Sequence, residues 1–240
     1  SASRLTGVEV TAVDEDGSPR PGLSVALVEP ELTDLTGEHG APVRRTAPSQ
    51  AAHMLADLVL DGVRTLVFVR SRQGAEVVAL TARRILADRG DHELAERVAA
   101  YRGGYLPSER RELEEALRTG ELLGLASTNA LELGVDISGL DAVLIAGWPG
   151  TRASLWQQAG RAGRGGGDAL AAFIARDDPL DTYLAHHPEA IFGQSVEATV
   201  LDPENPYILG PHLCAAAQEL PLTREDLTLF GPSMEGTLDD

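Results

Sequence analysis

Lysine is absent from this sequence, in which all 20 positively charged side chains are arginines. A P-loop nucleotide site places a lysine on the phosphates of its nucleotide. The chain therefore contains no complete P-loop site. Arginines can still contact phosphates, because each guanidinium carries a permanent charge and a planar fork of donors.

Cysteine, aromatic residues and long apolar runs are also scarce or absent. The single cysteine, Cys214, excludes an internal disulfide framework and a cysteine-rich metal site. Aromatic residues make up 4% of the sequence and hydrophobic residues 43%, so a core of mainly Ala, Leu and Val is expected. No run reaches transmembrane length and the N-terminus lacks a signal-peptide pattern, which together predict a soluble cytoplasmic protein without a membrane partner.

Negative charge dominates the sequence, whose formal net charge is -17. Phosphate contacts need local positive charge, so this value argues against a general nucleic-acid binder. It is compatible with a narrow basic track on an acidic body. The length of 240 residues predicts one large domain, or one domain with appendages.

Short apolar runs alternate with helical patterns in the middle of the chain. Strands are expected at residues 65–69, 122–126, 141–146 and 169–175, and helices at 51–60, 75–88, 107–119 and 154–160, with 94–101 open between helix and strand. This alternation predicts an α/β fold with a central, mainly parallel sheet. In such a sheet the functional loops lie at the carboxyl ends of the strands.

The two ends of the chain differ from this middle part. Val8–Val13 and Leu23–Val28 are apolar runs separated by a dense turn signal, which predicts an N-terminal pair of strands before a loop at 31–47. A helix is expected from Pro179 to His186, followed by a mostly helical extension with acidic turns after residue 220. The sequence thus predicts three parts, namely residues 1–47, 48–176 and 177–240.

Two clusters that follow the expected strands combine polar side chains with glycine or a helix start. Ser71, after Val67–Val69, can hold a phosphate together with the N-terminus of the following helix, although on this fragment alone a simple N-cap is the better interpretation. Arg102 and Gly103 can place a guanidinium and backbone amides on a phosphate. A glycine turn with a surface arginine explains them equally well.

A third cluster spans Ser127–Ile137. Thr128 and Asn129 offer a hydroxyl and an amide at a strand end that opens a short helix, an arrangement suited to a phosphate. Asp136, beyond that helix, can accept hydrogen bonds from a ribose or an arginine. The alternatives are an N-cap for Thr128 and a turn carboxylate for Asp136.

The fourth cluster is Gln157–Arg164, which follows a helix for which Thr151 is a candidate N-cap. Arg161 and Arg164 are three residues apart and share one face of a helix or helix end. Gly160 and Gly163 allow other backbone to approach closely. We interpret the pair as an arginine-finger element for a nucleotide; the alternative is a helix end with surface salt bridges. The four clusters in this order favour the nucleotide interpretation.

Other candidate residues carry weaker signals. Trp148, in a Gly-Trp-Pro-Gly loop, is suited either to stacking on a base or to anchoring the loop by packing. His186 and His187 are adjacent, and His212 and Cys214 are two residues apart, so neither pair shares a helix face. No metal site is predicted.

The order and spacing of the four clusters resemble the second RecA-like domain of superfamily 2 helicases. Val67–Arg72 resembles motif IV, Tyr101–Gly104 motif IVa, Ser127–Ile137 motif V and Gln157–Arg164 motif VI. Motif VI begins with glutamine rather than the histidine usual in DEAD-box RNA helicases, as in DNA-directed branches. The tail from Asp177 to Tyr207 is similar to bacterial mitomycin-repair helicases of the MrfA type, whose eukaryotic relatives share motifs with RecQ-like enzymes.

The resemblance implies a RecA-like three-layer domain at 48–176, in an ATP-dependent 3′-to-5′ DNA helicase or translocase of bacterial DNA repair, associated with the nucleoid when on DNA. It implies that a first RecA-like domain, expected upstream of residues 1–47, holds most of the ATP and Mg²⁺, and that residues 177–240 lead to a further module. The partner would be single-stranded or forked DNA, and the chain alone is expected to be inactive as an ATPase. The alternatives are an RNA helicase, a chromatin-type translocase or a non-catalytic nucleic-acid-binding domain.

The resemblance also implies a role for individual residues. Arg164 would be the arginine finger, Arg161 would contact the γ-phosphate, and Gln157 would couple the nucleotide to the cleft between the domains. The residues expected to meet the nucleotide are Gly134, Asp136, Gly160 and Gly163. Those expected to contact nucleic acid are Ser71, Arg72, Arg102, Gly103, Thr128, Asn129 and Trp148.

Overall fold

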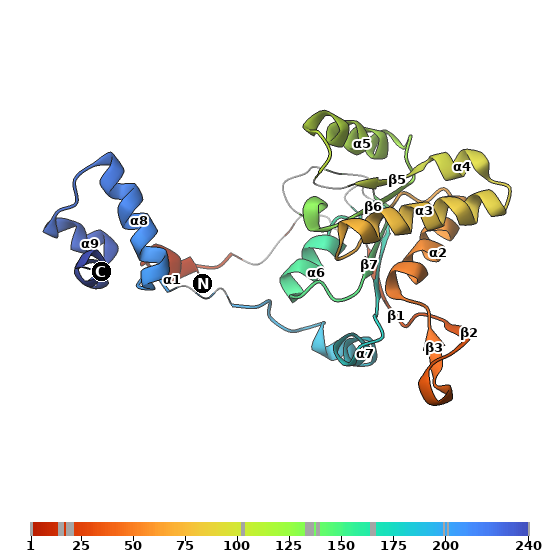
Figure 1. Ribbon diagram of the computed structural model, residues 1–240, viewed down its shortest axis with the longest axis horizontal. Coiled ribbons are helices and arrows are strands. Elements are labelled where there is room, and N and C mark those ends of the chain that lie inside the picture. The colour runs from red at the N-terminus through yellow and green to blue at the C-terminus, as the bar shows by residue number, and fades with distance from the viewer. Residues whose placement is uncertain are drawn as a thin grey trace. The chain divides into compact units, whose positions relative to one another are not determined.

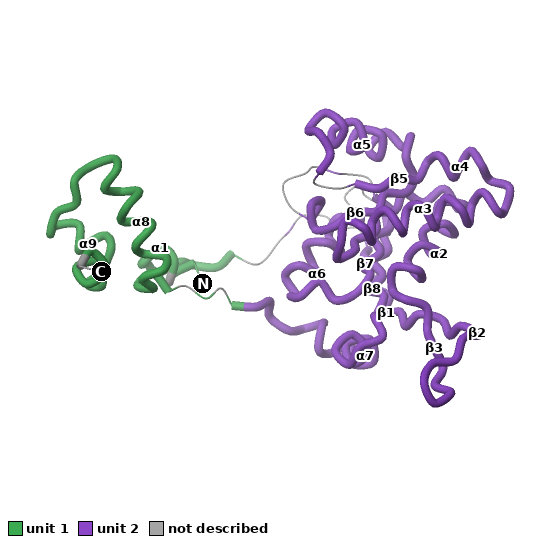
Figure 2. Tube along the Cα trace, viewed as in Figure 1, with its two compact units in different colours: residues 1–16, 198–240 green, residues 17–197 purple. Residues whose placement is uncertain are grey.

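The computed structural model describes residues 2–13, 17, 22–101, 104–132, 137, 140–163, 167–198, 200 and 202–239. The chain forms two compact units, shown in Figure 2. The larger unit spans residues 17–197, and the smaller one combines residues 1–16 with 198–240. All the candidate site residues belong to the larger unit.

A parallel sheet of six strands forms the centre of the larger unit (Figure 1). Its order is β1-β8-β7-β4-β6-β5, and every neighbouring pair within the described residues is parallel. The strands are β1 Leu23–Val28, β4 Thr65–Phe68, β5 Val98–Tyr101, β6 Gly124–Ser127, β7 Ala142–Ala146 and β8 Ala169–Ile174. The predicted α/β class with a mainly parallel sheet is confirmed.

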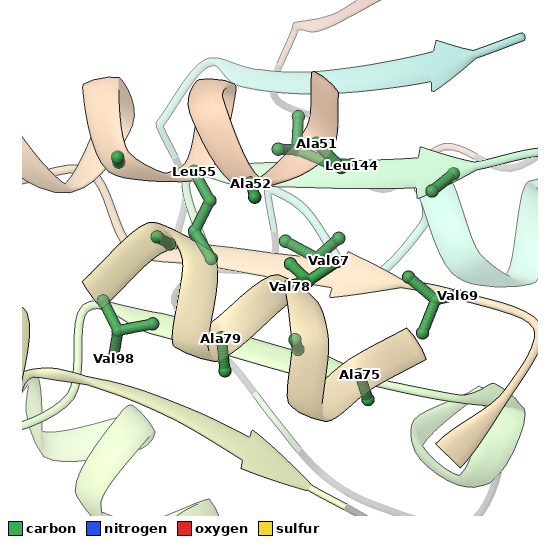
Figure 3. Close-up of a cluster of buried hydrophobic side chains, with 14 of the residues drawn as sticks. Ala51, Ala52, Leu55, Val67, Val69, Ala75, Val78, Ala79, Val98 and Leu144 are labelled. Carbon is green, nitrogen blue, oxygen red and sulfur yellow. The ribbon is translucent and has the colours of Figure 1, made fainter. Parts of the chain in front are cut away.

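Helices cover both faces of this sheet. On one face lie α2 Ala47–Leu60, α3 Arg72–Asp88 and α4 His92–Glu96, and on the other α5 Pro107–Thr119, α6 Arg152–Ala159 and α7 Pro179–His186. Successive strand residues face opposite layers: Val67 packs against α2 and α3 (Figure 3), whereas Leu66 belongs to the cluster beneath α5 and α6. The result is a three-layer domain with two apolar interiors.

Local capping sets the start of several helices. The Ser71 hydroxyl accepts a hydrogen bond from the Gly74 N–H at 2.9 Å and begins α3 directly after β4. Thr151 accepts from the Ser154 N–H at 3.0 Å and begins α6 after β7. Both predicted caps are confirmed, because a side-chain oxygen at N-cap satisfies a donor that the helix leaves unpaired.

The N-terminal segment differs from the prediction in its details. Residues 8–13 form no strand, and all three of their valines are exposed. Leu23–Val28 is a strand, but it pairs in parallel with β8, whose residues supply the long-range partner that a strand needs. The predicted loop at 31–47 contains an antiparallel pair, β2 Leu32–Thr36 and β3 Pro42–Arg44, around a 3-10 turn at Glu38–Gly40. The chain therefore has an N-terminal strand pair, formed by other residues than expected.

The C-terminal part is mostly helical, as predicted. After α7 a 3-10 turn, Pro188–Ala190, belongs to the larger unit. The smaller unit contains α1 Ala2–Thr6, α8 Pro206–Glu219, a 3-10 turn Arg224–Asp226, α9 Leu227–Phe230 and α10 Ser233–Asp239. Its small core consists of Leu209, Leu213 and Met234. Helices thus replace the acidic turns expected after residue 220, while the functional limits at 47/48 and 176/177 stay a prediction.

The helices in the described part of the chain are all too short or too polar to cross a membrane.

Gly124 provides a test of the packing between β6 and α2. A Cβ there would lie 3.1 Å from Leu55 Cδ1 and Val98 Cγ2, and 3.2 Å from Val59 Cγ2. Gly124→Ala should therefore overpack this layer and lower the free energy of unfolding by about 1–3 kcal/mol, measured by urea denaturation. Gly167→Ala, where a Cβ meets nothing within 4 Å, is the matched control and should be neutral or slightly stabilising.

Candidate functional site

A cavity lies at the carboxyl edge of the sheet, where β4 is flanked by β6 and β7. After β4, the chain adds β5 and β6 on one side of it and then β7 and β8 on the other side. The carboxyl end of β4 is therefore the switch point in strand order, where open α/β sheets bind ligands. The cavity has a volume of about 230 Å³. It is lined after β4 by Arg70, after β6 by Asn129 and Glu132, after β7 by Gly147 and Pro149, and from α6 by Ser154 and Gln158.

Ser71 and Arg72 lie at the start of α3, beside this cavity, and both are exposed. Ser71 caps the helix, and its hydroxyl hydrogen remains available as a donor while its oxygen accepts from Gly74. The capping and phosphate interpretations are therefore compatible. A phosphate near this point would also meet the positive end of a 17-residue helix.

Thr128 and Asn129 occupy the corresponding place after β6. The Thr128 hydroxyl accepts from the Ala130 N–H at 3.4 Å and caps a 3-10 turn, Asn129–Leu131. Asn129 is exposed and borders the cavity. The parallel sheet thus places the third cluster beside the first, because β4 and β6 are paired neighbours with Phe68 opposite Ser127.

The Gln157–Arg164 cluster begins at the end of α6. The helix ends at Ala159, and Arg161 lies beyond it rather than on a helical face. Arg161 is only 4% exposed, and its Nη2 donates to the Glu132 carbonyl oxygen at 2.6 Å. Gln157, in contrast, is exposed on α6.

Glu132 and Gln158 connect motif V to motif VI, and the sequence did not single them out. Gln158 is buried, and its Nε2 donates to Glu132 Oε2 at 2.9 Å and to Ser154 Oγ at 3.3 Å. The backbone of Glu132 holds Arg161 while its carboxylate holds Gln158. A polar residue at an inward helical position, next to Leu155 and Ala159, was the available signal for Gln158.

Glycine is favoured at positions 160 and 163 for two different reasons. A Cβ on Gly160 would lie 2.9 Å from the carbonyl oxygen of Trp156. Gly163 has a φ of 83°, a left-handed conformation that favours glycine, and its N–H donates to the Leu140 carbonyl at 3.0 Å. The chain after Arg161 therefore runs against Leu140, just before β7.

Five predicted site residues lie outside the described residues: Arg102, Gly103, Gly134, Asp136 and Arg164. The preceding residue Tyr101 is described and ends β5. Burial and a 2.7 Å hydrogen bond to Glu114 raise the pKa of Tyr101 to about 12. The Tyr101 side chain is buried in the core and fixes the end of β5, directly before Arg102 and Gly103 in the sequence.

Trp148 is held in place by packing and by its backbone. Its ring meets the Phe173 ring edge-on, with centroids 6.1 Å apart. The backbone N–H of Trp148 donates to Asp181 Oδ2 at 3.1 Å. The indole is partly exposed. The structure thus shows the loop-anchoring contacts, and stacking on a base stays a prediction.

A buried ion pair fixes the loops after β7 and β8. Asp181 is fully buried, and besides Trp148 it accepts from the N–H of Arg176 at 2.9 Å and from its Nε and Nη2, each at 3.0 Å. Hydrogen bonding to Asp181 raises the pKa of the Arg176 guanidinium. The sequence did not predict this contact, which joins α7 to two loops of the carboxyl edge.

A larger cavity, of about 1120 Å³, lies between α3, β5 and α5. Five glutamates and two arginines line it, so its charge disfavours phosphates. Within the described residues, no group of three or more His, Cys, Asp or Glu side chains is placed to hold a metal ion. Two residues that line the carboxyl-edge cavity, Glu132 and Gln158, accept hydrogen bonds from Arg161 through their carbonyl oxygens. This cavity is therefore the better candidate for one wall of a nucleotide or nucleic-acid site.

Two protein-family models match the chain. Residues 50–166 match the helicase conserved C-terminal domain. Residues 201–240 match the winged helix domain of the ATP-dependent helicase HRQ1. The first match contains all four motifs, and the second lies in the smaller unit.

The chain is similar to larger helicases. It is 39% identical over 224 residues to YprA, an ATP-dependent helicase of Bacillus subtilis, covering 93% of this chain and 29% of that protein. It is 39% identical over 221 residues to the ATP-dependent helicase HRQ1 of Saccharomyces cerevisiae, covering 90% of this chain and 20% of that protein. The chain therefore spans less than a third of the length of these relatives.

Solved structures agree with these matches. The helicase MrfA, bound to DNA and AMPPNP, superimposes with a TM-score of 0.78 at 38% identity, over 96% of this chain and 31% of that one. The helicase Lhr of Mycobacterium smegmatis shares the fold, with a TM-score of 0.70 at 22% identity over 92% of this chain and 29% of that one. The resemblance inferred from the motifs is confirmed: this chain carries the helicase C-terminal domain, the second RecA-like domain, of the superfamily 2 ATP-dependent helicases.

Proposed function

We propose that this chain is the second motor domain of a longer ATP-dependent DNA helicase or translocase that moves 3′ to 5′ and acts in DNA repair. One observation carries the proposal: a single edge of the sheet collects Ser71, Thr128 and Arg161 from three different motifs. The similar helicase MrfA holds DNA and AMPPNP in its crystal structure, which supports DNA and ATP as the ligands of this family.

The residues proposed to hold one DNA strand lie after β4, β5, β6 and β7. Ser71, Arg72, Thr128 and Asn129 present hydroxyl, guanidinium and amide donors at adjacent strand ends. Arg102 and Gly103 are proposed to join them from β5, and Trp148 from β7. Contacts of this kind are made to phosphates and predict little sequence preference. A narrow donor track also reconciles DNA binding with the net charge of -17.

The nucleotide is proposed to lie against Arg161 and Arg164, with Gln157, Gly134, Asp136, Gly160 and Gly163 around them. ATP with Mg²⁺ would supply the free energy of movement through hydrolysis. This chain has no lysine, which supports the proposal that a first RecA-like domain holds most of the phosphates and that these arginines form the opposite wall. Domain closure around the nucleotide would bring the arginines onto the γ-phosphate.

The test compares nucleic acids as activators of ATP hydrolysis by the intact protein. Single-stranded DNA should raise the turnover number well above the value without nucleic acid, and a forked duplex with a 3′ tail should be unwound in preference to one with a 5′ tail. The 240-residue chain alone is the control and should show no turnover. Activation by RNA only, or DNA-stimulated turnover by the chain alone, would refute the proposal.

A further inference from the structure

The last eight residues of the larger unit lie along α6. Arg152 Nε donates to the Ala190 carbonyl oxygen at 3.0 Å. Further along, the rings of Trp156 and Phe192 are 5.7 Å apart at an angle of 58°, and Ile191 between these contacts is fully buried. The segment at 190–197 therefore touches α6 at both of its turns, although 30 residues of chain lie between the two.

Glu197, the final residue of this segment, binds the N-terminus of α6. Its Oε1 accepts from the Arg152 N–H at 2.7 Å, and its Oε2 accepts from the Ala153 N–H at 3.2 Å. The Arg152 guanidinium also lies 3.7 Å from Oε1. These contacts, led by the backbone hydrogen bond from Arg152, hold the pKa of Glu197 below its usual range. The carboxylate is thus ionised and meets the positive end of the helix dipole at neutral pH.

With Glu197 in place, the N-terminus of α6 has a full set of hydrogen bonds. The first two N–H groups donate to Glu197, the third to the Thr151 hydroxyl and the fourth to the Thr151 carbonyl. The helix has eight residues, and helices shorter than about 12 residues are marginal on their own. Its position consequently depends on contacts from outside, and Glu197 adds to the Thr151 cap the acceptors for the first two N–H groups.

The other end of α6 leads to the arginines of motif VI. Gln158, on its last turn, bonds to Glu132, and Arg161 follows two residues after the helix. A shift of the helix along its axis would move both contacts together, because Gly160 continues directly from the helix. The start of α6 is thus mechanically connected to the predicted nucleotide contacts.

We propose that Glu197 is a positioning residue for Arg161, acting through α6 from the chain segment that enters the smaller unit. The inference rests on the proposed role of Arg161. Ala198, the next residue, is the first of the smaller unit, so the cap is formed by the chain on its way into the winged-helix match. Loss of the Glu197 contacts would free the start of α6 and, through the helix, the position of Arg161.

The experiment measures DNA-stimulated ATP hydrolysis of the intact protein carrying Glu197→Ala or Glu197→Gln. We expect Glu197→Ala to lower kcat by about three- to tenfold, as for loss of a helix cap, with KM for ATP nearly unchanged. Glu197→Gln should be intermediate, because the amide oxygen still accepts one N–H group. Deuterium uptake of residues 152–159, followed by mass spectrometry, should be faster in Glu197→Ala.

Glu189→Ala is the matched control. Its carboxylate lies eight residues earlier and pairs with His187, not with α6, so kcat and deuterium uptake at α6 should equal those of the wild type. A kcat for Glu197→Ala within about twofold of the wild type would overturn the inference, as would equal losses in both variants. Arg161→Ala separates the two proposals: if it hydrolyses ATP like the wild type, the proposed function fails, whatever Glu197 does.

Discussion

Arg164→Ala in the intact protein is expected to abolish ATP hydrolysis while ATP binding largely survives. An arginine finger stabilises charge that develops on the transferred phosphoryl group, and its loss lowers the rate by about 10³–10⁵-fold. In the proposed arrangement the opposite domain holds most of the nucleotide, so the affinity for ATP should change little. Steady-state turnover and equilibrium binding of a fluorescent ATP analogue measure the two quantities separately.

Two further variants define what Arg164 contributes. Arg84→Ala removes the same charge from the exposed surface of α3, where the side chain is 84% exposed beside Asp88, and should leave turnover unchanged. Arg164→Lys keeps the charge and loses the planar fork, so it should stay strongly impaired. Wild-type turnover by Arg164→Ala would remove this residue from the mechanism.

Asp181→Ala, which removes a fully buried carboxylate of α7, is expected to cause a large loss of stability. The substitution leaves the partly buried Arg176 guanidinium without its main partner and removes the acceptor of the N–H groups of Trp148 and Arg176. Breaking one side of a buried ion pair costs about 3–5 kcal/mol. Thermal unfolding should show it, since each kcal/mol shifts Tm by about 2–4 °C in a domain of this size.

The neighbouring aspartates provide graded comparisons. Asp177 is exposed, and Asp177→Ala should not change Tm. Asp178 pairs with the same arginine at 2.9 Å and caps α7, so Asp178→Ala should cost about 1 kcal/mol, the usual value of a cap. A Tm for Asp181→Ala equal to that of Asp178→Ala would show that burial of the ion pair contributes little to the free energy of unfolding.

The features that the sequence predicted are those decided by neighbouring residues. Ser71 and Thr151 cap their helices as expected, because a cap depends on side chain and backbone within three residues. The motifs were recognised for the same reason. Val8–Val13 has the apolar content of a strand but forms none, since a strand also requires a partner that the local pattern does not specify.

The features that the sequence missed depend on residues far apart in the chain. Glu132 meets Gln158 across 26 residues, Trp148 meets Asp181 across 33, and Arg152 meets Glu197 across 45. Each carboxylate in these contacts has the local appearance of an ordinary surface acid. The candidate site was therefore predictable as a set of motifs, and the contacts that hold those motifs in position were not.

The parallel pairing of β1 with β8 has a consequence for biosynthesis. Leu23 lies opposite Ala169, so during translation the partner strand of β1 is synthesised 146 residues after β1 itself. At ribosomal speeds of about 5–20 residues per second, this delay is roughly 7–30 s. During that time Leu-Ser-Val-Ala-Leu-Val is an unpaired apolar strand next to growing apolar chain, and unpaired strands invite aggregation. The nascent chain should thus need protection by chaperones until residue 174 has left the ribosome.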